Sequence, residues 1–212
     1  MTATHAPAPA ELDVIPALPP APEPPRRGRV VLVGTLLMIA AGVMLFGGLL
    51  AGYFSARDVA RAAGEAWPAE ETVLPNVPLF MAYLTLLMSS VTAQWSVSAI
   101  ASRDRRSMYV AIGLTLVLGL AFVNALSFSW GALGLAAGAN SYANAVYAVT
   151  VTHLLVVIAA HVGFVVVGFR ALGGQFSPRN RDLVAAAAAF WHFTTLIGLV
   201  IWYCLWFLEG GP

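Results

Sequence analysis

Charged side chains are missing from most of this 212-residue chain, and the places where they are missing indicate its class. Four segments contain no Asp, Glu, Lys or Arg: residues 30–56, 72–102, 107–169 and 183–208. A helix needs ~20 apolar residues to cross the hydrocarbon core of a bilayer, so the 63-residue third segment must hold two helices and a turn. With 59% hydrophobic and 10% charged residues, the chain is predicted to be an integral membrane protein.

Other absences exclude several functions. Lysine does not occur, and Cys204 is the one cysteine, which rules out an intrachain disulfide and a paired-thiolate copper centre. Within the four charge-free segments histidine is the only ionisable acid–base group of the kind that proton-coupled carriers use, which argues against a transporter. The formal net charge is only +1 and the arginines fall at predicted helix ends, so no nucleic-acid partner is indicated.

Turn-forming residues divide the 63-residue segment. They are Gly131, Gly134, Gly138, Asn140, Ser141 and Asn144. We therefore predict an all-α integral membrane protein, a five transmembrane helix bundle with helices near residues 30–56, 78–101, 108–130, 145–169 and 183–207. The bundle occupies residues 26–212. Residues 1–25 hold eight of the thirteen prolines and no aromatic residue, which predicts a disordered cytoplasmic tail.

The arginines predict the orientation of this bundle. Nine of the eleven fall on one side of the five predicted spans, and only Arg57 and Arg61 fall on the other. Because short cytoplasmic loops collect Lys and Arg, the N-terminus is predicted to be cytoplasmic and the C-terminus to lie outside. Between the first two helices, the polar segment 57–76 contains Trp67, Pro68, Glu65, Glu70 and Glu71. We expect a solvated loop there, with contact to a partner domain as the alternative.

Three histidines, His153, His161 and His192, lie within the predicted helices. Three imidazoles are too few for a catalytic haem-copper or multihaem centre. His161 and His192 lie about 13 and 14 Å from the cytoplasmic ends of the last two helices, at ~1.5 Å per residue, so together they could ligate one haem b. The alternative is that each imidazole stays neutral and hydrogen-bonds within the bundle.

Small and polar residues elsewhere in the spans are predicted to pack helices together. Gly48 and Gly52 form a small-xxx-small step, which lets two helix backbones approach closely. Ser89, Thr92 and Ser96 recur at three- and four-residue spacing on the second helix. Gln94 and Trp95 add a larger amphipathic pair on another side of it.

Segments in all five helices, in order, resemble the short form of haem-copper (cytochrome c) oxidase subunit III. The first helix reads IAAGVMLFGGLLAGYFSAR over residues 39–57, and the second carries SSVTAQW over 89–95, followed by RDRR at 103–106. The third helix has LVLGLAF at 116–122. The fourth has Tyr142, Tyr147, Thr150 and His153 in the family's spacing, and the fifth has Trp191-His192-Phe193.

The resemblance implies a non-catalytic subunit of a bacterial terminal oxidase in the cytoplasmic membrane. Its expected partners are oxidase subunits I and II, which would carry the haem and copper, and phospholipid; no cofactor or catalytic residue is expected in this chain. Subunit III of this family binds lipid, stabilises the catalytic subunit and is associated with oxygen access. The structural or lipid-contacting polar residues implied here are His192 and His153, with Trp191, Gln94 and Trp95.

Four positions depart from the family pattern. The family usually has Glu where this chain has Gly42, His at Val156, Glu at Ala185 and Asp at Thr195. A role of the first-helix carboxylate therefore does not carry over. These losses leave a subunit III-like accessory protein of nitric oxide reductase as the alternative function. A small haem b cytochrome using His161 and His192 is the alternative from another class.

Overall fold

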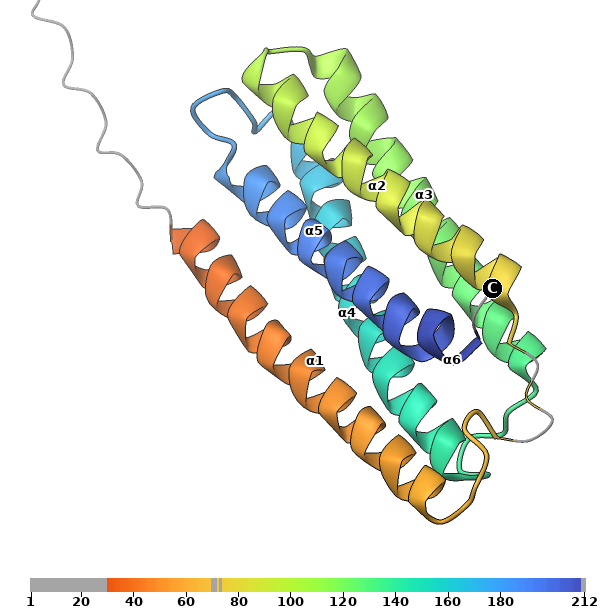
Figure 1. Ribbon diagram of the computed structural model, residues 1–212. Helices are drawn as coiled ribbons and strands as arrows, with labels where there is room; N and C mark the ends of the chain where they lie inside the picture. Colours follow the sequence, from red (N-terminus) through yellow and green to blue (C-terminus); the bar gives the residue numbers. More distant parts are fainter. Residues whose placement is uncertain (1–29, 70–71, 73, 211–212) are drawn as a thin grey trace, which may run out of the picture.

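Five long helices make up the computed structural model, which describes residues 30–69, 72 and 74–210 (Figure 1). They are α1 (Val30–Ala62), α2 (Asn76–Ala101), α3 (Arg105–Leu133), α4 (Ser141–Leu172) and α5 (Asp182–Trp202). The π-helix η1 (Tyr203–Phe207) and the short α6 (Leu208–Gly210) continue α5. All five are long and apolar enough to cross a membrane, and each predicted span lies within one of them when η1 is counted with α5. The five-helix prediction is confirmed, whereas its orientation in the membrane stays a prediction.

Capping residues make the connection between α3 and α4 shorter than the cluster of turn-forming residues suggested. Gly131 still belongs to α3, and the C-cap residue Gly134 follows the helix in the left-handed conformation (φ 64°). The Asn140 side chain accepts the Ala143 N–H (2.7 Å) and so begins α4, which places Ser141 inside that helix. Satisfying the free N–H groups at a helix start lets the helix begin earlier than its apolar run indicates.

A tight turn joins α2 to α3. Arg103 adopts φ 61°, and Asp104 caps α3 by accepting the Ser107 N–H (3.0 Å) and the Ser107 hydroxyl (2.6 Å). These hydrogen bonds hold the pKa of Asp104 below its ordinary value, because they stabilise the carboxylate form. The two helices consequently run antiparallel as a closely packed hairpin.

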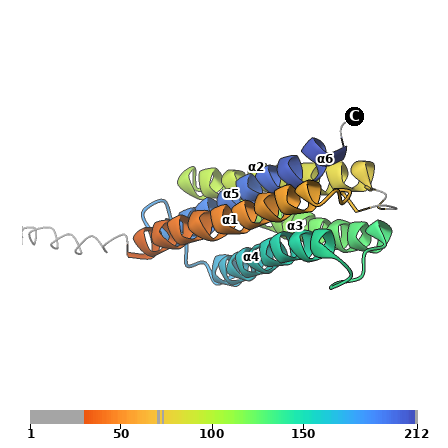
Figure 2. The ribbon, with the colours of Figure 1, turned by 60° about the horizontal axis from the view of Figure 1, so that its bottom comes forward.

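Helix α5 lies at the centre of the bundle, where it packs against α1, α2 and α4 (Figure 2). Helix α3 packs on α2 and α4, and α1 packs on α4 and α5. Half of the apolar span of α5 is buried within the chain, against 11% of the span of α1. Leu37 and Met44 of α1, for example, face outward with 68% and 81% of their surface exposed. An apolar exterior of this kind suits contact with lipid or with another membrane chain.

The structure differs from the solvated loop predicted for residues 57–76 in two ways: residues 57–62 continue α1, and Trp67 is buried. Trp67 is 7% exposed, donates its indole N–H to the Tyr53 hydroxyl (3.0 Å) and packs edge-on against the Tyr142 ring. Trp67 therefore holds the loop against the helices of its own chain. Glu65 is exposed, whereas Glu70 and Glu71 lie outside the described residues.

The same end of the bundle is closed by a buried carboxylate. Glu209, with a side chain only 1% exposed, accepts hydrogen bonds from Arg57 (3.0 Å) and Arg61 (2.8 Å) of α1. These ion pairs join two parts of the chain about 150 positions apart. They attach α6 to the last turns of α1.

Replacing Glu209 should loosen this end. For Glu209→Gln we expect a loss of about 1–2 kcal/mol in unfolding free energy, less than a fully buried pair contributes, because the Arg61 side chain is half exposed. Thermal unfolding in detergent, followed by circular dichroism, would measure it. Glu65→Gln is the matched control, because Glu65 is exposed and makes no ion pair within the described residues. Equal unfolding temperatures for the two variants would contradict the prediction.

Candidate functional site

Polar side chains from α2 and α5 meet inside the bundle. The Trp191 indole N–H donates to the Ser89 hydroxyl (2.9 Å). On the next residue, His192, Nδ1 lies at hydrogen-bond distance from the Ser90 hydroxyl, and Nε2 lies 3.0 Å from the Gln94 amide oxygen. We call Ser89, Ser90, Gln94, Trp191 and His192 the α2–α5 polar seam. It runs from fully buried Trp191 to exposed Gln94.

A neutral His192 satisfies both of its contacts. The Ser90 hydroxyl can donate to Nδ1, and the protonated Nε2 can then donate to the Gln94 oxygen. Each ring nitrogen is thereby used in joining α5 to α2. Hydrogen bonding within the bundle is one of the two alternatives that the sequence left open for this histidine, and a structural role for it stays a prediction.

His153 lies deeper and is completely buried. Its Nε2–H donates to the Thr194 carbonyl of α5 (2.9 Å), which joins α4 to α5. The rings of Phe46, Tyr83 and Phe122 surround it, with centroids 5.9–6.3 Å from its own. An aromatic cage of this kind positions the imidazole within the core, where it can support packing but cannot reach a lipid head group.

His161 does not meet His192 as a haem pair would require. Its ring packs against Trp191 and against Gly119 of α3, whereas His192 bonds to α2. A haem between them would have to break the contacts of His192 with Ser90 and Gln94. Within residues 30–69, 72 and 74–210, no three His, Cys, Asp or Glu side chains gather as metal ligands do.

Gln94 also borders an open groove between α2 and α5. The groove holds about 590 Å³ and runs from Gln94 past Val97 and Ala101 to Arg181 at the start of α5. Trp95 is 40% exposed on the same helix. Both residues are therefore accessible from outside the bundle, as a lipid contact requires.

Gly48 and Gly52 do not bring helices of this chain together. A Cβ built at either position meets no heavy atom within 4 Å, and both residues are exposed. The helix packing predicted for them would therefore need a helix of another chain. Close approaches occur instead at Gly42, Gly119 and Gly198, a set that sequence spacing missed because the opposing groups are large side chains.

Each of these three glycines makes room for a ring. Gly42 lies against the Phe193 ring, Gly198 against His153, and a Cβ at Gly119 would lie 2.7 Å from Trp191. The Phe193 ring thus occupies the space beside the position where the resembling family carries its first-helix glutamate. At Thr195, the place of the family's aspartate, the hydroxyl donates to the Trp191 carbonyl (3.0 Å).

Alanine at Gly119 should therefore destabilise the bundle. We expect Gly119→Ala to cost about 1–3 kcal/mol, since Trp191 and His161 would both have to shift in a packed core. Gly48→Ala is the matched control, because nothing opposes its Cβ and alanine favours a helix over glycine. Unfolding temperatures in detergent would compare the two, and an unchanged Gly119→Ala would refute the packing assignment. Reduced recovery of partner subunits with a stable Gly48→Ala would support a contact with another chain.

Comparison with known proteins agrees with this architecture. The family model for cytochrome c oxidase subunit III matches residues 27–209. The probable cytochrome c oxidase subunit 3 of Mycobacterium tuberculosis (strain ATCC 25618 / H37Rv) is 29% identical over 189 residues, covering 86% of this chain and 90% of that one. Cytochrome c oxidase subunit 3 of Corynebacterium diphtheriae is 28% identical with the same coverage, and that of Thermostichus vulcanus is 27% identical, covering 84% and 87%. The chain, a multi-pass membrane protein by its five apolar helices, belongs to the cytochrome c oxidase subunit III family, whose membership implies a place in the oxidase complex.

Proposed function

We propose that this chain is a non-catalytic subunit III of a bacterial haem-copper terminal oxidase of the cytochrome c oxidase type. It lies in the cytoplasmic membrane beside subunits I and II, stabilises subunit I, binds phospholipid and assists the entry of oxygen. One observation carries the proposal: the side chains of the α2–α5 polar seam hydrogen-bond to one another and so join α2 to α5. His192, Trp191 and Ser89 are all paired within the chain in this way. What the bundle offers to its surroundings is an apolar surface.

Helix α1 supplies the broadest such surface. It packs on α4 and α5 along one side, and its remaining faces are exposed. Val33, Leu37 and Met44 are each more than half exposed there. A membrane helix that is so little buried in its own chain is suited to packing against a partner subunit or ordered lipid. We assign α1 to that contact.

The α2–α5 groove supports lipid binding. Its wall is mainly apolar between Gln94 and Ala101, and Arg181 stands at its mouth. An acyl chain can lie along the apolar wall while a phosphate group receives hydrogen bonds from the guanidinium. Oxygen dissolves readily in such apolar regions, so lipid held here would provide a route for it. Haem and copper belong to the partner subunits in this proposal.

One observation is equally compatible with a second candidate function. The Phe193 ring lies directly against Gly42, so the bundle carries neither the family's first-helix carboxylate nor space for it at that point. A chain without that group fits equally a subunit III-like accessory protein of nitric oxide reductase. Such a protein would share the fold and the lipid contact but have different partners.

Purification from the native membrane in mild detergent would decide between these partners. With a tagged chain we expect oxidase subunits I and II to co-purify, together with oxygen consumption and a reduced-minus-oxidised haem spectrum. Recovery of nitric oxide reductase subunits instead would favour the second candidate. A haem band that stays with the isolated chain and is lost in His161→Ala or His192→Ala would overturn both and support a small haem b cytochrome.

Reporter fusions would test the proposed orientation. The Arg103–Arg106 turn carries three arginines, so a reporter placed there should be active only in the cytoplasm, as should one placed at the turn between α4 and α5. A fusion after Glu209 should report from the outer side. The opposite pattern would contradict the predicted orientation while leaving the five-helix fold intact.

A further inference from the structure

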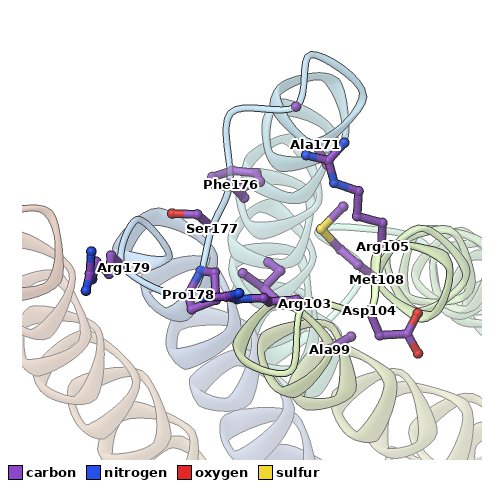
Figure 3. Close-up of a pocket in the computed structure, with 12 residues that line it drawn as sticks. Ala99, Arg103, Asp104, Arg105, Met108, Ala171, Phe176, Ser177, Pro178 and Arg179 are labelled. Carbon is purple, nitrogen blue, oxygen red and sulfur yellow. The ribbon is translucent and has the colours of Figure 1, made fainter. Parts of the chain in front are cut away.

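A cavity of about 460 Å³ opens at the arginine-rich end of the bundle, between the α2–α3 turn and the loop that joins α4 to α5 (Figure 3). Its apolar wall includes Ile100 of α2, Met108 of α3 and Phe176 of the loop. Arg103, Arg105 and Arg179 also line it. The cavity thus combines apolar walls with a cationic rim, and it lies on a different face of α2 from the α2–α5 groove, because the two share no lining residue.

Hydrogen bonds hold both sides of the cavity in place. The Tyr109 hydroxyl donates to the Ala171 carbonyl (3.2 Å), which ties α3 to the end of α4. In the loop, the Asn180 side chain donates to the Gln175 carbonyl (2.8 Å) and its N–H to the Ser177 carbonyl (2.9 Å). The cavity is therefore formed before any ligand arrives, and ligand binding would not have to order it.

The three arginines at the rim form no ion pair within the described part of the chain, and they outnumber the single acid that lines the cavity. The ion pairs found there involve only Arg57 and Arg61 at the opposite end. Asp104 is the acid among the lining residues, and its carboxylate is engaged as the cap of α3 through Ser107. Figure 3 shows this carboxylate turned away from Arg103, whose side chain lies beside Pro178.

We propose that this cavity binds the phosphate-bearing head group of an anionic phospholipid. Guanidinium groups donate paired hydrogen bonds to phosphate oxygens, and the rim lies at the ends of membrane-spanning helices, at the level of lipid head groups. The apolar wall of Ile100, Met108 and Phe176 would receive the adjoining glycerol and upper acyl chain. A free phosphate ion would gain nothing from that wall, and an acidic protein segment would expose its polar backbone to it.

This inference deepens the lipid contact of the proposed function by naming a site and a head-group class, and it rests on that contact alone. It does not depend on which respiratory complex the chain joins. Oxidase association and lipid selectivity can therefore fail separately. Each is measured on the same preparation.

The test is lipid binding by the tagged full-length chain, purified with the subunits that accompany it. Native mass spectrometry would compare binding of phosphatidylglycerol and phosphatidylcholine to the wild type and to the Arg103→Gln/Arg105→Gln variant. We expect preference for phosphatidylglycerol in the wild type and a loss of roughly fivefold per arginine, about 25-fold in the double variant. Arg106→Gln is the matched control, because Arg106 follows in the same turn but does not line the cavity; it should change binding less than about twofold.

A second measurement covers the case in which the double variant is poorly folded. Raising the salt concentration should weaken phosphatidylglycerol binding by the wild type and leave phosphatidylcholine binding unchanged. Equal binding of the two lipids would overturn the proposal, as would an equal loss in Arg106→Gln. If inorganic phosphate binds with the affinity of phosphatidylglycerol, the cavity is a simple anion site and the proposal is overturned. If the double variant loses partner subunits while its lipid binding is unchanged, the cavity is a protein interface and the proposal is likewise overturned.

Selective phosphatidylglycerol binding without oxidase subunits would support the site and count against the proposed oxidase role. Oxidase subunits recovered with a chain that shows no head-group preference would do the reverse. The two conclusions are thereby tested independently.

Discussion

A polar group placed in the hydrocarbon core of a bilayer is costly without a partner inside the protein, because no water is available there. The contacts between helices in this structure follow largely from that constraint, although some buried groups of the described residues, such as the Tyr83 hydroxyl and His153 Nδ1, form no hydrogen bond. Buried serine and threonine hydroxyls such as those of Ser96 and Thr150 donate to carbonyls of their own helix. These bonds offset the free-energy cost of burying the hydroxyl but do not link one helix to another. Larger polar groups cannot bond to their own helix in this way. The indole of Trp191 and the imidazoles of His153 and His192 bond to neighbouring helices or to their side chains, and so decide which helices pack together.

The central position of α5 follows from the same requirement. Its Trp191 and His192 bond to α2, and its Thr194 carbonyl receives the His153 ring from α4. Rings of this size need space on the facing helices, and glycine supplies it: Gly119 lies against Trp191. Because hydrophobic burial does little to hold helices together in lipid, these hydrogen bonds and close contacts define the arrangement.

The two ends of the bundle are organised in opposite ways. At one end Arg57 and Arg61 are neutralised by buried Glu209, and Trp67 packs into the end of the core. At the other end Arg103 and Arg105 line a cavity and form no ion pair in the described residues, because the lining acid, Asp104, caps α3 instead. The arginines at the α6 end are therefore paired within the chain, whereas those at the α2–α3 turn are free to bind an anionic ligand. This asymmetry suits a protein that is anchored to lipid head groups on its arginine-rich side and presents apolar helix faces to its neighbours between the two ends.

The sequence by itself determined the number and approximate limits of the helices, because the length of an uncharged run and the thickness of a bilayer leave few alternatives. Ordered matches along the chain also indicated the family correctly. The spacing of Ser89, Thr92 and Ser96 did mark a face of α2 that is buried or half-buried. The sequence could not indicate which polar residues meet, since the helices are otherwise apolar on most sides. Gly48 and Gly52 form a Gly-xxx-Gly step yet face outward, whereas Gly119 belongs to no Gly-xxx-Gly step and contacts two rings. Tertiary structure alone decided three features, because each depends on residues that only helix packing brings together. They are the pairing of His192 with Ser90 and Gln94, the burial of Trp67 against the bundle, and the cavity beside Arg105.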